Sequence, residues 1–221
     1  MRVSSRLKKA AELVPKGLTV RDIGADHGFL SLELAGKGNK VYAVENKKGP
    51  YQRLAETLKR DKTGKTFPLF QDGISFLPED VQGLILLGRG GNTIASILKE
   101  KEAELKKRKF ILIEPQSDFR IPIFYLLRLG LVNDDGCYVF EKRYYPLLRF
   151  VPGEKKEYSS DELEYGPYPI RNKDQVLLKH IEGKIHLLEH VQKEKKVDCS
   201  DKISELEKVK RKLRRKDHGE R

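Results

Sequence analysis

The sequence contains no tryptophan, a single methionine and only two cysteines in 221 residues. Cys137 and Cys199 lie too far apart to show the spacing of a metal site or a disulfide framework. No run of about 18 apolar residues is present, which argues against a membrane-spanning helix, and residues 1–6 lack the apolar segment of a secretory signal. We therefore expect a cytoplasmic protein that binds neither a metal nor a membrane.

Acidic residues are in the minority, because 45 lysines and arginines stand against 33 aspartates and glutamates and give a net charge of +12. An excess of this size favours a polyanionic partner such as a nucleic acid, although a basic protein without such a partner can have the same composition. Residues 208–221 are especially basic, with eight lysines and arginines and two acids. These cations either form a solvated helical face or bind phosphates.

Short apolar segments alternate with amphipathic ones through the first two thirds of the chain. This alternation predicts a Rossmann-like, doubly wound α/β fold with a mostly parallel sheet. An antiparallel hairpin, formed by residues 131–145 and 147–151, is expected to close the sheet. The other expected strands are 18–24, 41–45, 66–70, 84–87 and 110–113, and the expected helices are 5–14, 29–35, 50–59, 93–107 and 120–129.

The pattern changes after residue 153. Residues 156–172 are polar and indicate a linker between a first domain, residues 1–155, and a helical segment, residues 173–221. Apolar residues of that segment recur in steps of three and four, which is typical of a coiled coil. A break with Ser200 as a helix cap predicts an antiparallel helical hairpin. The two apolar stripes are Ile181, Ile185 and Leu188, and Ile203, Leu206, Val209 and Leu213.

The segment from Asp22 to Phe29 carries the clearest chemical signal, because a buried strand delivers an acid and then a glycine into a turn that opens a helix. Gly24 allows the backbone to approach a ligand closely, and the helix start offers free N–H groups. Both the dinucleotide-binding G-x-G-x-x-G pattern and the phosphate-binding loop pattern are absent. Asp22 suits a cationic ligand, such as the sulfonium and amino groups of S-adenosylmethionine, unless it only caps the turn.

Three later signals each follow a predicted strand. Glu45 lies about 20 residues beyond the glycine turn, where an acid can accept two hydrogen bonds from ribose hydroxyls. Asp72 can accept an adenine amino group, although the pair Asp72–Gly73 is also an ordinary turn sequence. A glycine cluster, residues 88–92, follows the fourth strand, and ligands bind at this edge of open α/β sheets.

These segments resemble the bacterial tRNA (adenine(22)-N1)-methyltransferases of the TrmK type over nearly the whole chain. The family's Ser-x-Arg-Leu start is matched at residues 4–7, and its D-[IV]-G-[ST]-D-H-[AG]-[YF]-L motif at residues 22–30, with Ala25 as a departure. Its A-x-E-x-x-x-G-P motif is matched at residues 43–50. The Asp-His pair after the glycine makes the resemblance fairly specific. Further similar segments lie at residues 112–116, 136–138 and 165–168.

The resemblance implies transfer of a methyl group from S-adenosylmethionine to N1 of an adenosine in tRNA, at position 22. It places Asp26 and His27 near the transferring methyl group, as candidate catalytic residues. It also implies that the C-terminal hairpin helps to hold the tRNA, and we expect a monomer. The expected cofactor ligands are Asp22, Ile23, Gly24, Glu45, Asn46, Asp72, Gly73 and Gly88, and the expected RNA contacts are Arg6, Arg89, Lys208, Lys210, Arg211, Arg214 and Arg215.

Arg89 is the most consequential departure, because it replaces the methionine of the family's G-M-G-G cluster. The family's Gln-Pro-Asn is also Glu-Pro-Gln here, at residues 114–116. An arginine in the pocket can stack on the target base or pair with a phosphate, or it can block the base and repel a cationic product. Two alternatives stay open: a catalytically impaired relative that binds tRNA or a partner, and a methyltransferase with another substrate.

Overall fold

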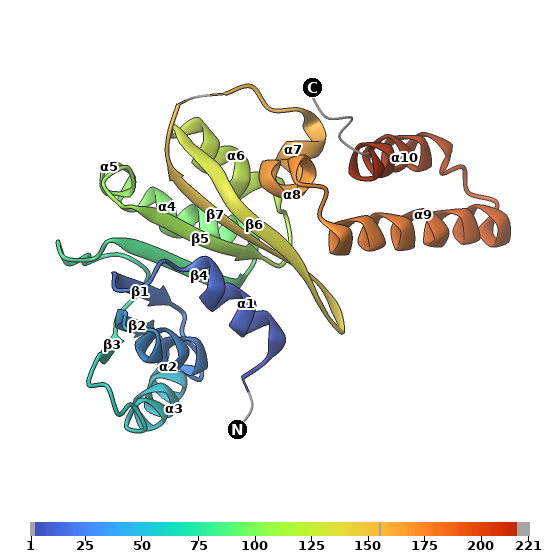
Figure 1. Cartoon of the computed structure of the whole chain (residues 1–221). Helices are drawn as coiled ribbons and strands as arrows, with labels where there is room; N and C mark the ends of the chain where they lie inside the picture. Colours follow the sequence, from blue (N-terminus) through green and yellow to red (C-terminus); the bar gives the residue numbers. More distant parts are fainter. Residues whose placement is uncertain (1–2, 155, 216–221) are drawn as a thin grey trace.

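A single seven-stranded sheet with the order β3-β2-β1-β4-β5-β7-β6 organises the molecule. The computed structural model describes residues 3–154 and 156–215 (Figure 1). Strands β1 to β5 run parallel to one another, and β7 runs antiparallel to both β5 and β6. This order confirms the predicted Rossmann-like sheet with an antiparallel closing hairpin. The strands are β1 (Thr19–Ile23), β2 (Lys40–Glu45), β3 (Thr66–Phe70), β4 (Gly83–Arg89), β5 (Phe110–Pro115), β6 (Leu131–Glu141) and β7 (Arg143–Pro152).

Helices cover both faces of the sheet, because strand residues alternate in direction and bury an apolar side chain on each face. On one face lie α1 (Ser5–Leu13), α2 (Phe29–Gly36) and α3 (Lys48–Leu58), and on the other lie α4 (Gly91–Lys99), α5 (Glu102–Leu105) and α6 (Arg120–Arg128). Ser4 caps the first helix, since its side chain accepts the N–H of Leu7.

Two expected element boundaries were wrong. The helix expected over residues 93–107 is divided into α4 and α5, because the backbone at Lys101 leaves the helical region, with φ −138° and ψ 43°. The closing hairpin turns at Lys142, which has φ +65°, and not at Pro146. Pro146 can lie inside β7 because β5 pairs with β7 only from Leu148 to Phe150. Position 146 therefore needs no N–H for hydrogen bonding to β5.

The segment predicted to be a linker, residues 156–172, contains two short helices, α7 (Ser160–Tyr165) and α8 (Pro167–Arg171). A capping box fixes the start of α7: the N–H of Glu162 donates to the Ser159 hydroxyl, and the N–H of Ser159 donates to the Glu162 carboxylate. The two helices pack on α6 and β6. Both helices are short, with six and five residues, so no helical period repeats in the sequence to reveal them.

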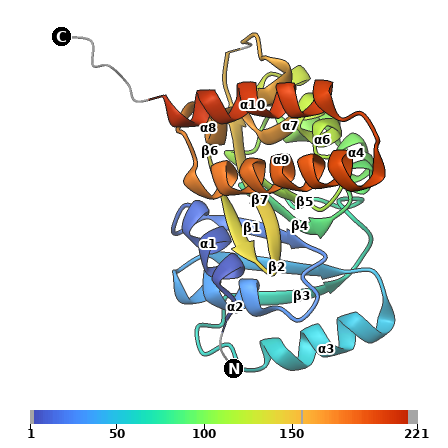
Figure 2. The same ribbon diagram turned by 90° about the vertical axis from the view of Figure 1, so that its right-hand side faces the viewer.

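The C-terminal helical hairpin consists of α9 (Gln175–Lys195) and α10 (Ser200–Arg214), which lie side by side (Figure 2). Both predicted apolar stripes lie in one shared cluster with Tyr138 and Tyr165. The break falls where we expected it, but Ser200 begins α10 rather than capping it, and its N–H donates to Asp198. Residues 216–221, the end of the predicted basic segment, lie outside the described residues. None of the helices described is long and apolar enough to cross a membrane.

Candidate functional site

Two neighbouring cavities open at the carboxyl edge of the parallel strands. The larger cavity, about 760 Å³, lies over the ends of β1, β2 and β4 and is also walled by the start of α1 and by the β6–β7 hairpin. The smaller cavity, about 220 Å³, lies over the ends of β2 and β3 and against α4. Their position agrees with the general rule that ligands bind at this edge of open α/β sheets.

The turn after β1 forms the floor of the larger cavity. Gly24 has φ +73°, a left-handed conformation that glycine adopts without strain. The N–H groups of Gly24 and Ala25 both donate to the carbonyl of Val44, at 2.8 and 3.1 Å, so the turn is tied to β2. Asp22 is buried beside it and accepts a hydrogen bond of 2.7 Å from the Ser31 hydroxyl. Burial raises the pKa of Asp22 from 3.8 to about 6, against the opposing effect of that hydrogen bond.

Glu45 connects β2 to the same turn. Its side chain is buried, and its Oε1 accepts the N–H of Asp26 at 3.1 Å. This bond helps to hold Asp26 at φ +49°, a conformation uncommon for a residue with a side chain. The carboxylate of Asp26 is exposed and lies 3.7 Å from Nε2 of His27, whose ring stacks on Phe29 at a centroid distance of 5.7 Å. The structure thus brings together four of the predicted site residues, Asp22, Asp26, His27 and Glu45, at one cavity.

The smaller cavity contains the second predicted group. Ile23, Asp72 and Gly73 line it, and Asn46 and Gly24 line both cavities. Nδ2 of Asn46 donates to Oδ1 of Asp72 at 2.7 Å, which joins the ends of β2 and β3. Because the two cavities share these walls, a single elongated ligand can reach from Asp22 to Asp72.

Arg21 supports the smaller cavity, and the sequence analysis missed it. Its guanidinium is fully buried on the face of β1 opposite Asp22, where it donates to the carbonyls of Phe76 at 2.7 Å and Gly73 at 3.2 Å. Burial lowers the pKa of Arg21 to about 10. The available signal was a charged residue inside an otherwise buried strand, since a buried cation normally has a structural or functional partner.

Arg89 lies between the two cavities and lines both of them. Its guanidinium rests on Gly24 so closely that a Cβ added to the glycine would lie 1.7 Å from Nη2 of Arg89. Nε of Arg89 is buried and has no hydrogen-bond partner in the described part of the chain. The arginine therefore narrows the passage from one cavity to the other, and Gly88 lies beside it in the wall of the larger cavity.

The start of α1 and the β6–β7 hairpin close the larger cavity from the other side. Arg6 forms an ion pair of 2.6 Å with the buried Glu114 and lies 5.0 Å from the centre of the Tyr145 ring. Burial raises the pKa of Glu114, while Arg6 opposes that shift. Glu141, Lys142 and Tyr145 also line the cavity, but the misplaced hairpin turn hid their role in the sequence.

The remaining predicted RNA contacts form a separate group on the C-terminal hairpin, away from both cavities. Some of these cations are already paired: Lys210 with Glu207 at 2.7 Å, and Arg214 with Glu182 of α9. The full group consists of Lys208, Lys210, Arg211 and Arg214 on α10 and Arg215 directly after it. Among the described residues, no cluster of three or more His, Cys, Asp or Glu is arranged to hold a metal ion.

Comparison with known families and curated proteins gives two matches that agree with this geometry. Residues 3–147 match the family described as a methyltransferase domain. The chain is also similar to the tRNA (adenine(22)-N(1))-methyltransferase of Bacillus subtilis strain 168, with 26% identity over 119 residues. That alignment covers 52% of this chain and 50% of the relative, so the chain matches about half the length of this curated protein.

Solved structures extend the similarity of fold to almost the entire chain. Sp1610 of Streptococcus pneumoniae, solved in complex with S-adenosyl-L-methionine, is 25% identical, with a TM-score of 0.84 and coverage of 95% of this chain and 100% of that one. TrmK of M. capricolum, solved with S-adenosylhomocysteine, is 21% identical, with a TM-score of 0.76 and coverage of 97% of each chain. The shared fold therefore includes the C-terminal helices.

Proposed function

Because the chain belongs to the methyltransferase-domain family, we propose that it transfers a methyl group from S-adenosylmethionine to N1 of an adenosine in tRNA. One observation carries this proposal: the buried acids Asp22 and Glu45 flank the glycine turn at Gly24, in a cavity that adjoins a second one at Asp72. The similarity to a tRNA (adenine(22)-N(1))-methyltransferase supports both the tRNA substrate and nucleotide 22 as the target.

The residues of the two cavities fit the chemical groups of S-adenosylmethionine. Asp22 offers a buried carboxylate to the cationic methionine end, and Gly24, which has no side chain, permits close contact there once Arg89 moves aside. Glu45 offers its carboxylate to the ribose hydroxyls, and Asp72 with Gly73 receives the adenine. When bound, the cofactor supplies a methyl group that its positively charged sulfur makes electrophilic.

In this proposal the target adenine enters the larger cavity beside Asp26 and His27. The N1 atom is normally engaged in base pairing, so the base must first leave its stack. The lone pair of N1 then forms the new N–C bond as the C–S bond breaks, and the electrons of that bond remain on sulfur. Much of the rate arises from alignment of the two groups. Asp26 stabilises the positive charge that the methylated ring acquires, and His27 is the second candidate for this role.

Basic residues at the larger cavity and on the C-terminal hairpin bind the tRNA in this proposal. Arg6 and Arg89 lie at the larger cavity, and the cations of α10 lie at the C-terminal hairpin. Phosphates attract such residues without regard to sequence, so they position the RNA rather than select the base. As part of the same proposal, the protein acts in the cytoplasm as a monomer.

The direct test measures methyl transfer from labelled S-adenosylmethionine to unmodified tRNA, followed by nuclease mapping of the product. Label recovered as N1-methyladenosine at position 22 supports the proposal in full. Label on another nucleotide changes the target, and bound cofactor without any transfer favours the second candidate function. That candidate is a tRNA-binding relative with impaired catalysis, and the position of Arg89 against Gly24 is the observation in its favour.

Asp26→Ala is expected to reduce kcat about 100-fold, because removal of one charge-stabilising group has an effect of that order. Binding of S-adenosylmethionine should change little, since the Asp26 side chain is exposed and Glu45 contacts only its backbone N–H. Single-turnover rates and calorimetric binding of the cofactor check the two parts separately. Normal turnover in Asp26→Ala would remove this residue from the mechanism.

Cofactor affinity should fall as the pH is lowered through about 6. The pKa of Asp22 in the free protein is about 6, so its carboxylate is charged above that pH and neutral below it. Only the charged form attracts the cationic end of the cofactor, and each pH unit below 6 should weaken binding by up to about tenfold. Titrations of Asp22→Asn should show weaker binding that no longer varies across this range. An equal pH dependence in both proteins would contradict the prediction.

A further inference from the structure

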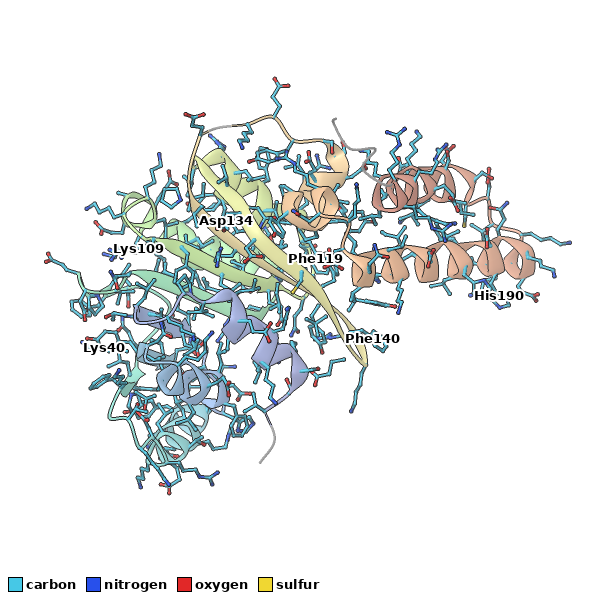
Figure 3. All side chains as sticks on the ribbon, viewed as in Figure 1. Lys40, Lys109, Phe119, Asp134, Phe140 and His190 are labelled. Atoms are coloured by element: carbon cyan, nitrogen blue, oxygen red, sulfur yellow. The ribbon has the colours of Figure 1, made fainter. Side chains whose placement is uncertain are left out.

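The tip of the β6–β7 hairpin, residues 140–145, extends past the mouth of the larger cavity. Lys142 forms the turn itself, with φ +65°, and lines the cavity together with Glu141 and Tyr145. Phe140 projects at the free end of the hairpin, away from the body of the molecule (Figure 3). Phe140 is 57% exposed, so a large part of its ring is open to an external partner.

The two adjacent tyrosines of β7 point to opposite sides of the hairpin, as successive strand residues do. Tyr144 packs against His180 of α9, at a centroid distance of 4.5 Å, and against Phe140 at 4.8 Å. Tyr145 faces the larger cavity and lies between two cations, Arg6 at 5.0 Å and Arg143 at 4.8 Å. The hairpin tip therefore has two faces: Tyr145 and Arg143 face the side of the larger cavity, and Phe140 and Tyr144 face the side of the C-terminal hairpin.

The charge at the hairpin tip is available for an external partner. Arg143 and Lys142 form no ion pair with any of the residues that the structure describes. The Arg143 guanidinium lies over the Tyr145 ring, and its charge also opposes the rise that burial causes in the pKa of Glu114. Aromatic rings beside arginines are the combination that binds unpaired nucleotides, because bases stack on the rings and phosphates pair with the cations. The hairpin tip also borders the larger cavity, to which the proposed function assigns the target base, and a membrane or a protein partner would not need that connection.

We propose that the hairpin tip, with Arg6, is a docking surface for the RNA strand on either side of the methylated nucleotide. Tyr145 forms the wall against which the extruded base stacks, Arg143 and Lys142 bind the adjoining phosphates, and Phe140 stacks on a neighbouring unpaired base. This inference rests on the proposed function, since it assumes that the larger cavity receives a nucleotide of tRNA.

The test uses the full-length protein and unmodified tRNA, with Phe140→Ala, Arg143→Ala and the double variant. Neither side chain lines either cavity. Phe124→Ala is the matched aromatic control, because Phe124 is 52% exposed on α6, on the other face of the sheet from α1. Lys106→Ala is the charge control, because Lys106 is exposed before the amino end of β5, at the opposite edge of the sheet.

The dissociation constant of tRNA, measured from about 50 to about 200 mM salt, gives the readout. The double variant should lose at least about tenfold in tRNA affinity, as expected when one stacked base is lost. Arg143→Ala should reduce the slope of log Kd against log salt by about one, because one phosphate contact disappears. The two controls should match the unaltered protein, and all variants should bind S-adenosylmethionine with unchanged affinity.

The outcomes separate this inference from the proposed function. If the unaltered protein binds and methylates tRNA but the double variant behaves like the Phe124→Ala and Lys106→Ala controls, the hairpin tip is not a docking surface and the inference is overturned. If the unaltered protein neither binds nor methylates tRNA, the proposed function fails, and the inference fails with it. A loss of tRNA affinity confined to the hairpin variants supports both.

Discussion

Replacement of Arg89 by methionine should strengthen binding of S-adenosylmethionine by about tenfold, corresponding to about 1.4 kcal/mol. The guanidinium lies against Gly24, where the cationic methionine end of the cofactor is proposed to bind. Two like charges about 4–8 Å apart repel by about 2–4 kcal/mol at an effective dielectric constant of about 20, and displacement of the side chain reduces that penalty. Methionine at position 89 removes the charge and is the residue that the family's G-M-G-G cluster has at this position.

S-Adenosylhomocysteine provides the control ligand, because it lacks the positive charge on sulfur but has the same α-carboxylate at its amino-acid end. Both ligands must displace Arg89 from Gly24, but only S-adenosylmethionine is also repelled through its sulfonium charge. The affinity for S-adenosylhomocysteine should therefore improve by only about threefold in Arg89→Met. Arg60→Met removes a cation that is exposed at the end of α3 and should leave both affinities unchanged. Calorimetry on the three proteins gives all the required constants.

Weaker binding of both ligands in Arg89→Met would contradict this prediction and would assign Arg89 to the carboxylate that they share. Equal affinities in Arg89→Met and the unaltered protein would show that moving the Arg89 side chain away from Gly24 costs negligible free energy. If neither protein binds either ligand, the proposed cofactor is wrong. The experiment therefore also decides between an active enzyme and an impaired relative, because turnover can be measured in the same two proteins.

Glu45→Ala should weaken binding of S-adenosylmethionine by about 100-fold. Two hydrogen bonds from ribose hydroxyls to a charged acceptor are lost, and each contributes about 1.5–3 kcal/mol to binding. Water molecules that take the place of the Glu45 carboxylate accept hydrogen bonds from the same hydroxyls and reduce this loss. The substitution also removes the acceptor for the N–H of Asp26, whose left-handed conformation depends on its surroundings. A loss of turnover beyond the loss of affinity should follow, because Asp26 is then less well positioned.

Glu45→Gln is the matched variant for this prediction. Its amide oxygen can still accept the N–H of Asp26, but the negative charge is gone, so binding should fall by about tenfold and the remaining turnover should exceed that of Glu45→Ala. Thermal unfolding of both variants controls for stability. Cofactor affinity that is unchanged in Glu45→Ala would exclude Glu45 as a ribose ligand.

The sheet and the acids at its edge could be predicted because their signals are local. Each strand is a short apolar run before a turn, and Asp22, Glu45 and Asp72 lie at or just after the carboxyl ends of three successive strands. Parallel strands place their carboxyl ends at one edge, so the three acids had to lie near one another. The apolar stripes of α9 and α10 were predictable for the same reason, since a helical period repeats along the sequence.

The features that the sequence did not reveal depend on contacts between distant segments. Arg89 was recognised as unusual, but its position on Gly24 depends on how β4 lies beside β1. Tyr145 entered the cavity wall only because the hairpin turns at Lys142, a residue with no special turn preference. Arg21 bonds to carbonyls more than 50 positions away, and nothing in the neighbouring sequence identifies those acceptors.

Arg21 and Asp22 also determine how the specificity of this site can be redesigned. They are consecutive residues of one rigid strand, and they serve opposite faces of the sheet: Asp22 faces the larger cavity, while Arg21 holds the loop at Gly73 and Phe76. The positions of the residues that contact the two ends of the proposed ligand are therefore both fixed by the same two residues of β1. Substitutions that are meant to admit a bulkier nucleoside analogue should therefore be made in the loop at residues 73–76 and not in β1. Any shift of β1 would displace both Asp22 and the loop held by Arg21, and would disturb both ends of the binding site at once.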